Sequence, residues 1–338
     1  MTGLDRIAIT GASGFLGGTL LDALPSSSHV RILSRREWDP DVRPKHLDVI
    51  LGDLDDDAAL AQLVKGANTV VHCAASMGKK DSQKSWRINV EGTARLARAA
   101  ARAGVSHFVY VSSISVFGAT RTTKVIGEKT IPKHLQRLNP YARTKYEGEL
   151  EVRRIGQETG LGYTIVRPTN VYGPGSGPWF EQFASLLRRL PVAFGRFLVD
   201  IVYVDDVVDG LLRAAAQLPD GRVYHFGHEQ VPLVRFMEEV GRVIGREPRA
   251  LPRALDRAVR QAIDWSYRLA TGTEMSMSLV QERSYPHVHS YVELGYDPQV
   301  NLTEGFRRIA AAYRAPGMWI RNPEGPVSRL EYGDACSS

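Results

Sequence analysis

The chain has 338 residues, of which 43% are hydrophobic and 24% are charged, values typical of a soluble globular protein of one or two domains. It contains no stretch of about 18 apolar residues, and its N-terminus lacks a basic region followed by an apolar one, so we expect neither a membrane span nor secretion. The net charge of +6 favours small anionic ligands but is too diffuse for nucleic acid, and two cysteines without a CxxC pattern are typical of a reduced, cytoplasmic protein.

The first predicted element is a strand at residues 6–10 that runs directly into a glycine-rich loop. Residues 10–17 read Thr-Gly-Ala-Ser-Gly-Phe-Leu-Gly, and apolar residues then resume at helical spacing. A strand, a tight glycine turn and a helix in this order let the backbone approach a pyrophosphate and direct the helix N-terminus at its charge. The predicted dinucleotide contacts are Gly11, Ser13, Gly14, Phe15, Leu16 and Gly17.

The rest of the first half alternates short strands with helices. Strands rich in β-branched and aromatic residues are expected at residues 30–34, 47–51, 69–73, 108–112 and 163–167. The clearest helical patterns cover residues 89–103 and 141–158. Strands separated by helices pair in parallel, so the expected fold is α/β, with a Rossmann-type doubly wound parallel sheet.

A smaller, mostly helical domain that holds the substrate is predicted beyond Pro168. A turn-rich loop at residues 170–178 marks the change, and helical patterns predominate towards the C-terminus. The predicted division is a dinucleotide-binding domain at 1–168, to which 201–228 return, a substrate domain made of 169–200 and 229–316, and a polar tail at 317–338.

The segment at residues 251–270 is basic and amphipathic, with Trp265 and Tyr267 among its residues. Two interpretations are open. Such a helix can touch a membrane surface or a hydrophobic substrate. The interpretation that we favour is a helix packed on the small domain with its arginines turned outward.

Tyr141 and Lys145 form the second informative pattern. Residues four apart share one face of a helix, so the two side chains can act together. A free tyrosine has a pKa near ~10, and a neighbouring ammonium with an oxidised nicotinamide ring favours the phenolate. Tyr141 is therefore a candidate general acid and base for an alcohol or a carbonyl. Serines end the strand at 108–112, where open α/β sheets place ligands, so one serine hydroxyl is predicted to bind the substrate oxygen.

These patterns belong to an ordered set that covers roughly residues 5–315. Its members are the glycine-rich loop at 10–17 and the segments at 52–54, 72–75, 89–93, 110–118, 141–145, 167–170 and 202–206. With this set the chain resembles the extended short-chain dehydrogenases/reductases. That family includes nucleotide-sugar epimerases and dehydratases, 3β-hydroxysteroid dehydrogenases and dihydroflavonol-reductase-like enzymes.

The resemblance implies a role for each matching residue. It places the catalytic serine at Ser113, the acid/base at Tyr141 and the lysine that also binds the nicotinamide ribose at Lys145. The other implied cofactor contacts are Asp53 and Leu54 at the adenine, Ala74 and Ala75 where the backbone passes the cofactor, Asn89 near the ribose and Pro168 at the nicotinamide. Asn89 is alternatively a helix cap. On the substrate side the predicted residues are Ser76, Met77 and Asn170. No metal site is predicted.

The end of the second strand bears on the choice of cofactor. An acidic residue there would bind a ribose 2′-hydroxyl, whereas an arginine accommodates a 2′-phosphate. The chain has Arg35 and Arg36 at this point, and guanidinium groups suit phosphate. We therefore predict NADP(H) in preference to NAD(H). The alternative is that both arginines are merely exposed and Glu37 reaches the ribose.

One position departs from the nucleotide-sugar members of the family. Many of them carry an arginine that helps to hold the diphosphate, and the matching residue here is Val199. Arg188, Arg189 and Arg196 are candidates to compensate. The departure favours a less charged substrate, because a diphosphate needs charge-assisted donors.

The leading hypothesis is an NADP(H)-dependent oxidoreductase that interconverts a ketone and a secondary alcohol. The alternative is a nucleotide-sugar 4-epimerase or dehydratase with tightly bound NAD(P), and a non-catalytic dinucleotide sensor ranks last because the catalytic trio is complete. The expected partner is a small-molecule substrate, and the resemblance implies a homodimer formed through the helices at 89–103 and 141–158.

Overall fold

The computed structural model describes residues 4–38, 46–77, 82–118, 125–133, 135–272 and 283–314. The predicted tail at 317–338 and Cys336 lie outside the described residues. Among the helices that are described, none is both long and apolar enough to span a membrane.

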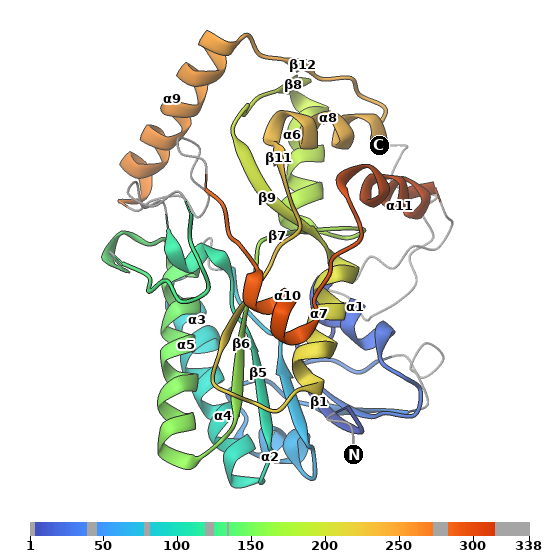
Figure 1. Cartoon of the computed structure of the whole chain (residues 1–338), viewed down its shortest axis with the longest axis vertical. Coiled ribbons are helices and arrows are strands. Elements are labelled where there is room, and N and C mark those ends of the chain that lie inside the picture. The colour runs from blue at the N-terminus through green and yellow to red at the C-terminus, as the bar shows by residue number, and fades with distance from the viewer. Residues whose placement is uncertain are drawn as a thin grey trace.

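A seven-stranded parallel sheet forms the centre of the larger part of the molecule (Figure 1). Its strands are β1 (Arg6–Thr10), β2 (His29–Ser34), β3 (Leu47–Leu51), β4 (Thr69–His72), β5 (His107–Val111), β6 (Tyr163–Pro168) and β10 (Val223–Phe226). Their order is β10-β6-β5-β4-β1-β2-β3. The chain therefore starts in the middle and winds outward in both directions, which confirms the predicted doubly wound sheet and puts a topological switch point between β1 and β4.

Helices cover both faces of this sheet. One face carries α1 (Phe15–Ala23) and α7 (Val204–Ala216), and the other carries α2 (Asp57–Val64), α4 (Thr93–Arg102) and α5 (Pro140–Thr159). Successive residues of a strand point to opposite faces, so Ile9 packs with the first group of helices and Ala8 with the second. The predicted helix at 89–103 starts inside η1 (Arg87–Gly92), a π-helix that follows α3 (Ser82–Trp86).

Helices and two small sheets make up the part of the chain above the large sheet in Figure 1. The strands are β7 (Asn170–Tyr172), β9 (Leu198–Tyr203) and β11 (Glu229–Pro232) in one sheet, and β8 (Val192–Ala193) and β12 (Arg249–Ala250) in the other. The helices are η4 (Gly177–Glu181), α6 (Gln182–Arg189), α8 (Leu233–Val243), α9 (Arg253–Thr271) and α11 (Leu302–Arg314). Helix α10 (Val288–Leu294) instead packs on β10 and α7 of the larger part. Tyr172, Phe236 and Phe306 lie at the centre of its apolar core, with ring centroids 5.1 to 5.8 Å apart.

A buried ion pair joins α5 to the sheet. The Arg167 guanidinium on β6 donates through Nε to Glu149 Oε1 at 2.8 Å and through Nη2 to Oε2 at 2.6 Å. The Ser112 hydroxyl, just after β5, donates to the same Oε1 at 2.6 Å. Both charged side chains are almost completely buried, so the pair fixes the position of α5 against the ends of two strands.

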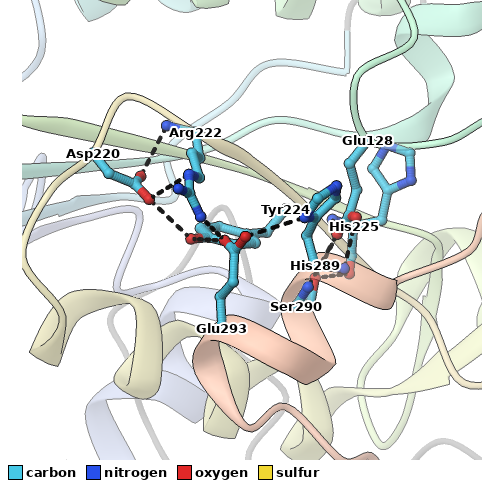
Figure 2. Close-up of polar contacts among 8 residues, drawn as sticks. All are labelled: Glu128, Asp220, Arg222, Tyr224, His225, His289, Ser290 and Glu293. Carbon is cyan, nitrogen blue, oxygen red and sulfur yellow. Dashed lines mark hydrogen bonds and ion pairs between the residues drawn. The ribbon is translucent and has the colours of Figure 1, made fainter.

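A second polar network holds α10 against β10 (Figure 2). The Glu128 carboxylate accepts hydrogen bonds from the backbone N–H of His289 at 2.9 Å and of Ser290 at 3.2 Å, and from the Ser290 hydroxyl at 2.9 Å. It also accepts from the backbone N–H of His225 on β10 at 3.2 Å. A carboxylate at the first turn of a helix is stabilised by the helix dipole, so Glu128 is both a cap and a link to the sheet.

The other half of this network surrounds Tyr224 on β10. Its hydroxyl lies 2.9 Å from Glu293 Oε2 and 3.2 Å from Asp220 Oδ2, and Arg222 bridges the same two carboxylates (Figure 2). These contacts come from the strand, the turn before it and α10. They are partly exposed, so their individual contributions to stability are small compared with that of Glu128.

Replacing Glu128 with alanine is expected to lower the free energy of unfolding by about 3 kcal/mol, because three backbone N–H groups lose a buried acceptor. Urea unfolding followed by circular dichroism measures the change. Glu158→Ala is the matched control, because Glu158 is exposed and pairs only with Arg154 in an i,i+4 contact worth about 0.5 kcal/mol. Equal stability of the two variants would contradict the role of Glu128.

Replacing Glu149 with glutamine leaves the buried Arg167 charge without its counter-ion, and we expect a loss of about 3 kcal/mol in the free energy of unfolding. The same urea measurement tests this. Glu147→Gln, two residues away on α5, is the control, since its carboxylate is partly exposed and lies 4.0 Å from Arg143. A Glu149→Gln variant as stable as this control would refute the claim that the ion pair anchors α5.

Candidate active site

The glycine-rich loop after β1 has the shape that a dinucleotide requires. Gly11 has a positive φ of 77°, and a Cβ at this residue would lie 2.6 Å from the backbone nitrogen of Ala74. A Cβ at Gly17 would lie 2.3 Å from the carbonyl oxygen of Gly11. Helix α1 starts at Gly14 without a side-chain cap, so its first N–H groups remain suited to an anion. These features fit the pyrophosphate of a dinucleotide at the predicted loop.

His72, at the end of β4, connects β4 to β1 and α4 through two side-chain contacts. Its Nδ1 lies 2.5 Å from Thr10 Oγ1 at the end of β1, and its Nε2 lies 2.9 Å from Thr93 Oγ1 at the start of α4. Burial, with the nearby Lys145 charge, lowers the pKa of His72 to about 3, so the imidazole is neutral. Sequence reasoning included His72 in the segment at 72–75 but gave it no role, because a lone histidine in an apolar strand carries no distinctive pattern.

Asn89 connects this loop to α5. Its Oδ1 accepts from the Ser76 backbone N–H at 2.7 Å, and its Nδ2 donates to the Ser76 carbonyl at 2.8 Å and to Thr144 Oγ1 at 2.9 Å. Asn89 lies inside η1, so the alternative that it caps a helix is wrong. Its amide holds the backbone beside Ala74 and Ala75 at a fixed distance from the helix that carries Tyr141.

The remaining residues predicted at the adenine end lie at the ends of β2 and β3. Arg35 and Arg36 are exposed, and the Ser34 hydroxyl donates to the Arg36 carbonyl at 2.7 Å, which shapes the turn. Asp53 is exposed and its Oδ1 accepts from the Asp55 backbone N–H at 2.9 Å. Leu54 is buried against Gly92, where an added Cβ would lie 2.8 Å from the Leu54 Cβ.

Ser113, Tyr141 and Lys145 come together at the carboxyl end of β5. Asn139 caps α5 by accepting from the Ala142 N–H at 2.9 Å, and this places Tyr141 in the first turn and Lys145 one turn later. The Ser113 side chain lies close enough to the Tyr141 hydroxyl to lower the pKa of that tyrosine. Lys145 is buried, with Nζ 4.2 Å from the centre of the Tyr110 ring.

Burial controls the proton affinity of the two α5 residues. It raises the pKa of Tyr141 to about 12, against a smaller opposite effect of the neighbouring Ser113 side chain. It lowers the pKa of Lys145 to about 7, while the negative charge of Glu149 acts in the opposite direction. A lysine that titrates near neutral pH beside a tyrosine is an arrangement that can exchange a proton with a bound alcohol or carbonyl.

Glu149 is a functional residue that sequence reasoning missed. It lies one further turn along α5 from Lys145, and its negative charge supports the protonated form of that lysine. The signal was present in the spacing, because Tyr141, Lys145 and Glu149 are four residues apart and share one helix face.

The side predicted to face the substrate lies between β6, β7 and β9. Pro168 ends β6, and Asn170 donates through Nδ2 to the Asp200 carbonyl at 2.6 Å. Asp200 is buried, which raises its pKa to about 6, and its Oδ2 accepts from Gln230 Nε2 at 3.0 Å. Val199 packs into the apolar core of the small part, so this position offers no donor to a diphosphate.

Two further residues predicted on the substrate side follow β4. The Ser76 hydroxyl lies 3.2 Å from the Ser85 hydroxyl, and Met77 is 47% exposed. Within the described part of the chain, no group of three or more His, Cys, Asp or Glu side chains is arranged to hold a metal ion.

Comparison with known proteins agrees with this geometry. A family model described as the NAD dependent epimerase/dehydratase family matches residues 7–227. The chain is 35% identical over 237 residues to a 3 beta-hydroxysteroid dehydrogenase/Delta 5-->4-isomerase of Mycobacterium tuberculosis, an alignment that spans 65% of this chain and 63% of that relative. It is 30% identical over 333 residues to a ceramide reductase of Caulobacter vibrioides, with 94% of this chain and 96% of the relative covered.

Solved structures share the fold. The UDP-glucose 4-epimerase of Thermotoga maritima superposes with a TM-score of 0.73 at 22% identity, covering 91% of this chain and 98% of that one. The glycine loop, the sheet order and these similarities agree. The chain therefore belongs to the NAD dependent epimerase/dehydratase family and is an enzyme of the extended short-chain dehydrogenase/reductase type.

Proposed function

We propose that the protein is an NADP(H)-dependent oxidoreductase that interconverts a ketone and a secondary alcohol. The observation that carries the proposal is the convergence of Ser113, Tyr141 and Lys145 at the carboxyl end of β5, next to the glycine loop of the switch point. A bound nicotinamide dinucleotide supplies the hydride chemistry. The side chains of this protein supply orientation and proton transfer.

Each of the three residues has a distinct role in this proposal. In reduction the Tyr141 hydroxyl donates its proton to the carbonyl oxygen, and in oxidation the phenolate accepts the alcohol proton. The Ser113 hydroxyl orients the same substrate oxygen. Lys145, one turn along the same helix face, is the residue that would hold the ribose, and in its protonated form it would favour the phenolate of Tyr141.

The substrate side favours a compound without a diphosphate. Val199 is buried in the core, and nothing on this strand replaces the charged donor that a diphosphate needs. The named relatives include a 3 beta-hydroxysteroid dehydrogenase, a 2-alkyl-3-oxoalkanoate reductase and a ceramide reductase. We therefore propose a hydroxyl or keto group on a largely apolar molecule as the reacting group.

The second candidate function is a nucleotide-sugar 4-epimerase or dehydratase. Asn170 supports it by keeping the substrate-side position of the family, and the fold of UDP-glucose 4-epimerase supports it in general terms. The two functions differ in cofactor balance, because an epimerase returns its hydride and consumes no cofactor. A homodimer formed through α4 and α5, which lie side by side, is proposed for either function.

The Tyr141→Phe variant is expected to lose turnover by about a thousandfold while cofactor still binds, because only the acid/base hydroxyl is removed. The assay follows NADPH absorbance with 3-ketosteroids, 3-oxoalkanoates and UDP-glucose side by side. Tyr146→Phe is the matched control on the same helix. Near-normal turnover by Tyr141→Phe would refute the catalytic assignment, and conversion of UDP-glucose without net cofactor consumption would favour the epimerase.

NADPH is expected to bind more tightly than NADH because Arg35 and Arg36 suit a 2′-phosphate. Replacing both with alanine should weaken NADPH binding by about tenfold or more and leave NADH binding unchanged. Fluorescence titration gives the dissociation constants, with Arg95→Ala on the exposed face of α4 as control. Tighter binding of NADH by the unaltered protein would reject the NADP(H) assignment and favour Glu37 as the ribose contact.

A further inference from the structure

Helix α9 has an apolar face that the rest of the described protein does not cover. At 3.6 residues per turn, its apolar residues recur three and four positions apart and form one stripe. The stripe consists of Leu255, Ala258, Ala262, Trp265 and Leu269. All five are exposed, with Leu255 at 50%, Trp265 at 66% and Leu269 at 71% of their full accessible surface.

Contact between α9 and the small part of the molecule uses a different edge of the helix. Asp256 accepts from the Gly195 backbone N–H at 2.5 Å and pairs with Arg260 Nε at 3.0 Å, and the Arg260 guanidinium lies 5.2 Å from the Phe197 ring centre. Ile263 adds an apolar contact to the core. The structure agrees with the favoured expectation that the helix packs on the small part, and Arg253 and Arg257 are exposed. The contact runs through the edge that carries Asp256, Arg260 and Ile263, so the apolar stripe faces outward.

The chemistry of the stripe and its flank points to a lipid surface. Arg257 is exposed on the flank of the stripe nearest Trp265, and arginines outnumber aspartates four to two along the helix. Tryptophan prefers the boundary between headgroups and acyl chains, where its ring is apolar and its N–H can reach water. Arginine side chains at such a boundary extend towards phosphate groups while their stems stay on apolar surface.

A second copy of the chain suits this face less well. Two α9 helices placed stripe to stripe would bring two net positive helices together. Alanine at two of the five stripe positions also leaves a small apolar area compared with the ~1,200 Å² that a stable protein interface buries. An anionic lipid surface matches both the net positive charge of the helix and its small apolar stripe.

We propose that α9 is an interfacial helix that binds the enzyme to membranes containing anionic phospholipids, with Trp265 and Leu269 in the acyl boundary and Arg257 at the phosphates. The helix lies along the surface and does not cross the bilayer. Arg283 donates to the Gly118 carbonyl just after η2 (Ile114–Phe117). Binding through α9 is independent of which carbonyl compound the enzyme reduces.

Flotation of the full-length protein with vesicles tests the proposal. The unaltered protein should float with vesicles of phosphatidylcholine mixed with phosphatidylglycerol, bind much less to pure phosphatidylcholine, and lose binding as salt is raised. Trp265→Ser and Leu269→Ser should each weaken binding by about tenfold. Arg257→Gln should weaken the preference for the anionic vesicles, whereas Arg253→Gln, on the opposite side of the helix, should change it less. Absence of binding by the unaltered protein, or binding that is equal in the serine variants, would overturn the proposal.

Two controls separate lipid binding from other causes. Leu218→Ser alters a leucine that is 89% exposed outside α9 and should leave flotation unchanged. Urea unfolding should give the same midpoint for all variants, since the replaced side chains are exposed. Light scattering without lipid measures the oligomeric state. A dimer that the Trp265→Ser variant dissociates, in a protein that does not float, would assign the face to a second copy instead.

Discussion

Glu149 and Arg167 place opposite charges in a region from which water is excluded, where neither is stable without the other. Because the pair joins the middle of α5 to the end of β6, and Ser112 ties it to β5, the helix has one allowed position along its axis. That position brings Tyr141 opposite Ser113 and buries Lys145 against the Tyr110 ring. The reactive end of the helix is thus set by an interaction two turns away from the chemistry.

The supports nearer the cofactor side are neutral. His72 and Asn89 have no net charge in their surroundings, and each bonds to two different elements of the fold. His72 and Asn89 add no net charge to the site, and Glu149 is the acidic group that acts most strongly on Lys145. The negative charge of Glu149 offsets part of the effect of burial, so the pKa of Lys145 stays near 7 instead of falling further.

The sequence predicted the sheet, its order of strands and helices, and the residues of the glycine loop, because these depend on local periodicity and on a glycine pattern. Ser113, Tyr141 and Lys145 could also be predicted, since their spacing and the family resemblance agree. The partners of Arg167 and His72 could not be predicted, because their contacts join residues 18 to 62 positions apart and depend on how the strands align. The outward direction of the apolar stripe of α9 stayed open at the level of the sequence, since amphipathicity defines a face but not the direction in which it points.

Glu128 links parts of the chain that lie far apart in the sequence. It precedes α5 in the sequence, yet its carboxylate caps α10, some 160 residues later, and binds the backbone of β10 (Figure 2). The C-terminal segment is therefore not a removable module. A chimera that combines the N-terminal half of this enzyme with the substrate-binding part of a relative keeps Glu128 but loses the helix end that Glu128 caps. The buried carboxylate is then left without its hydrogen-bond donors. An exchange of substrate specificity within the family therefore has to transfer the capping residue and the helix together.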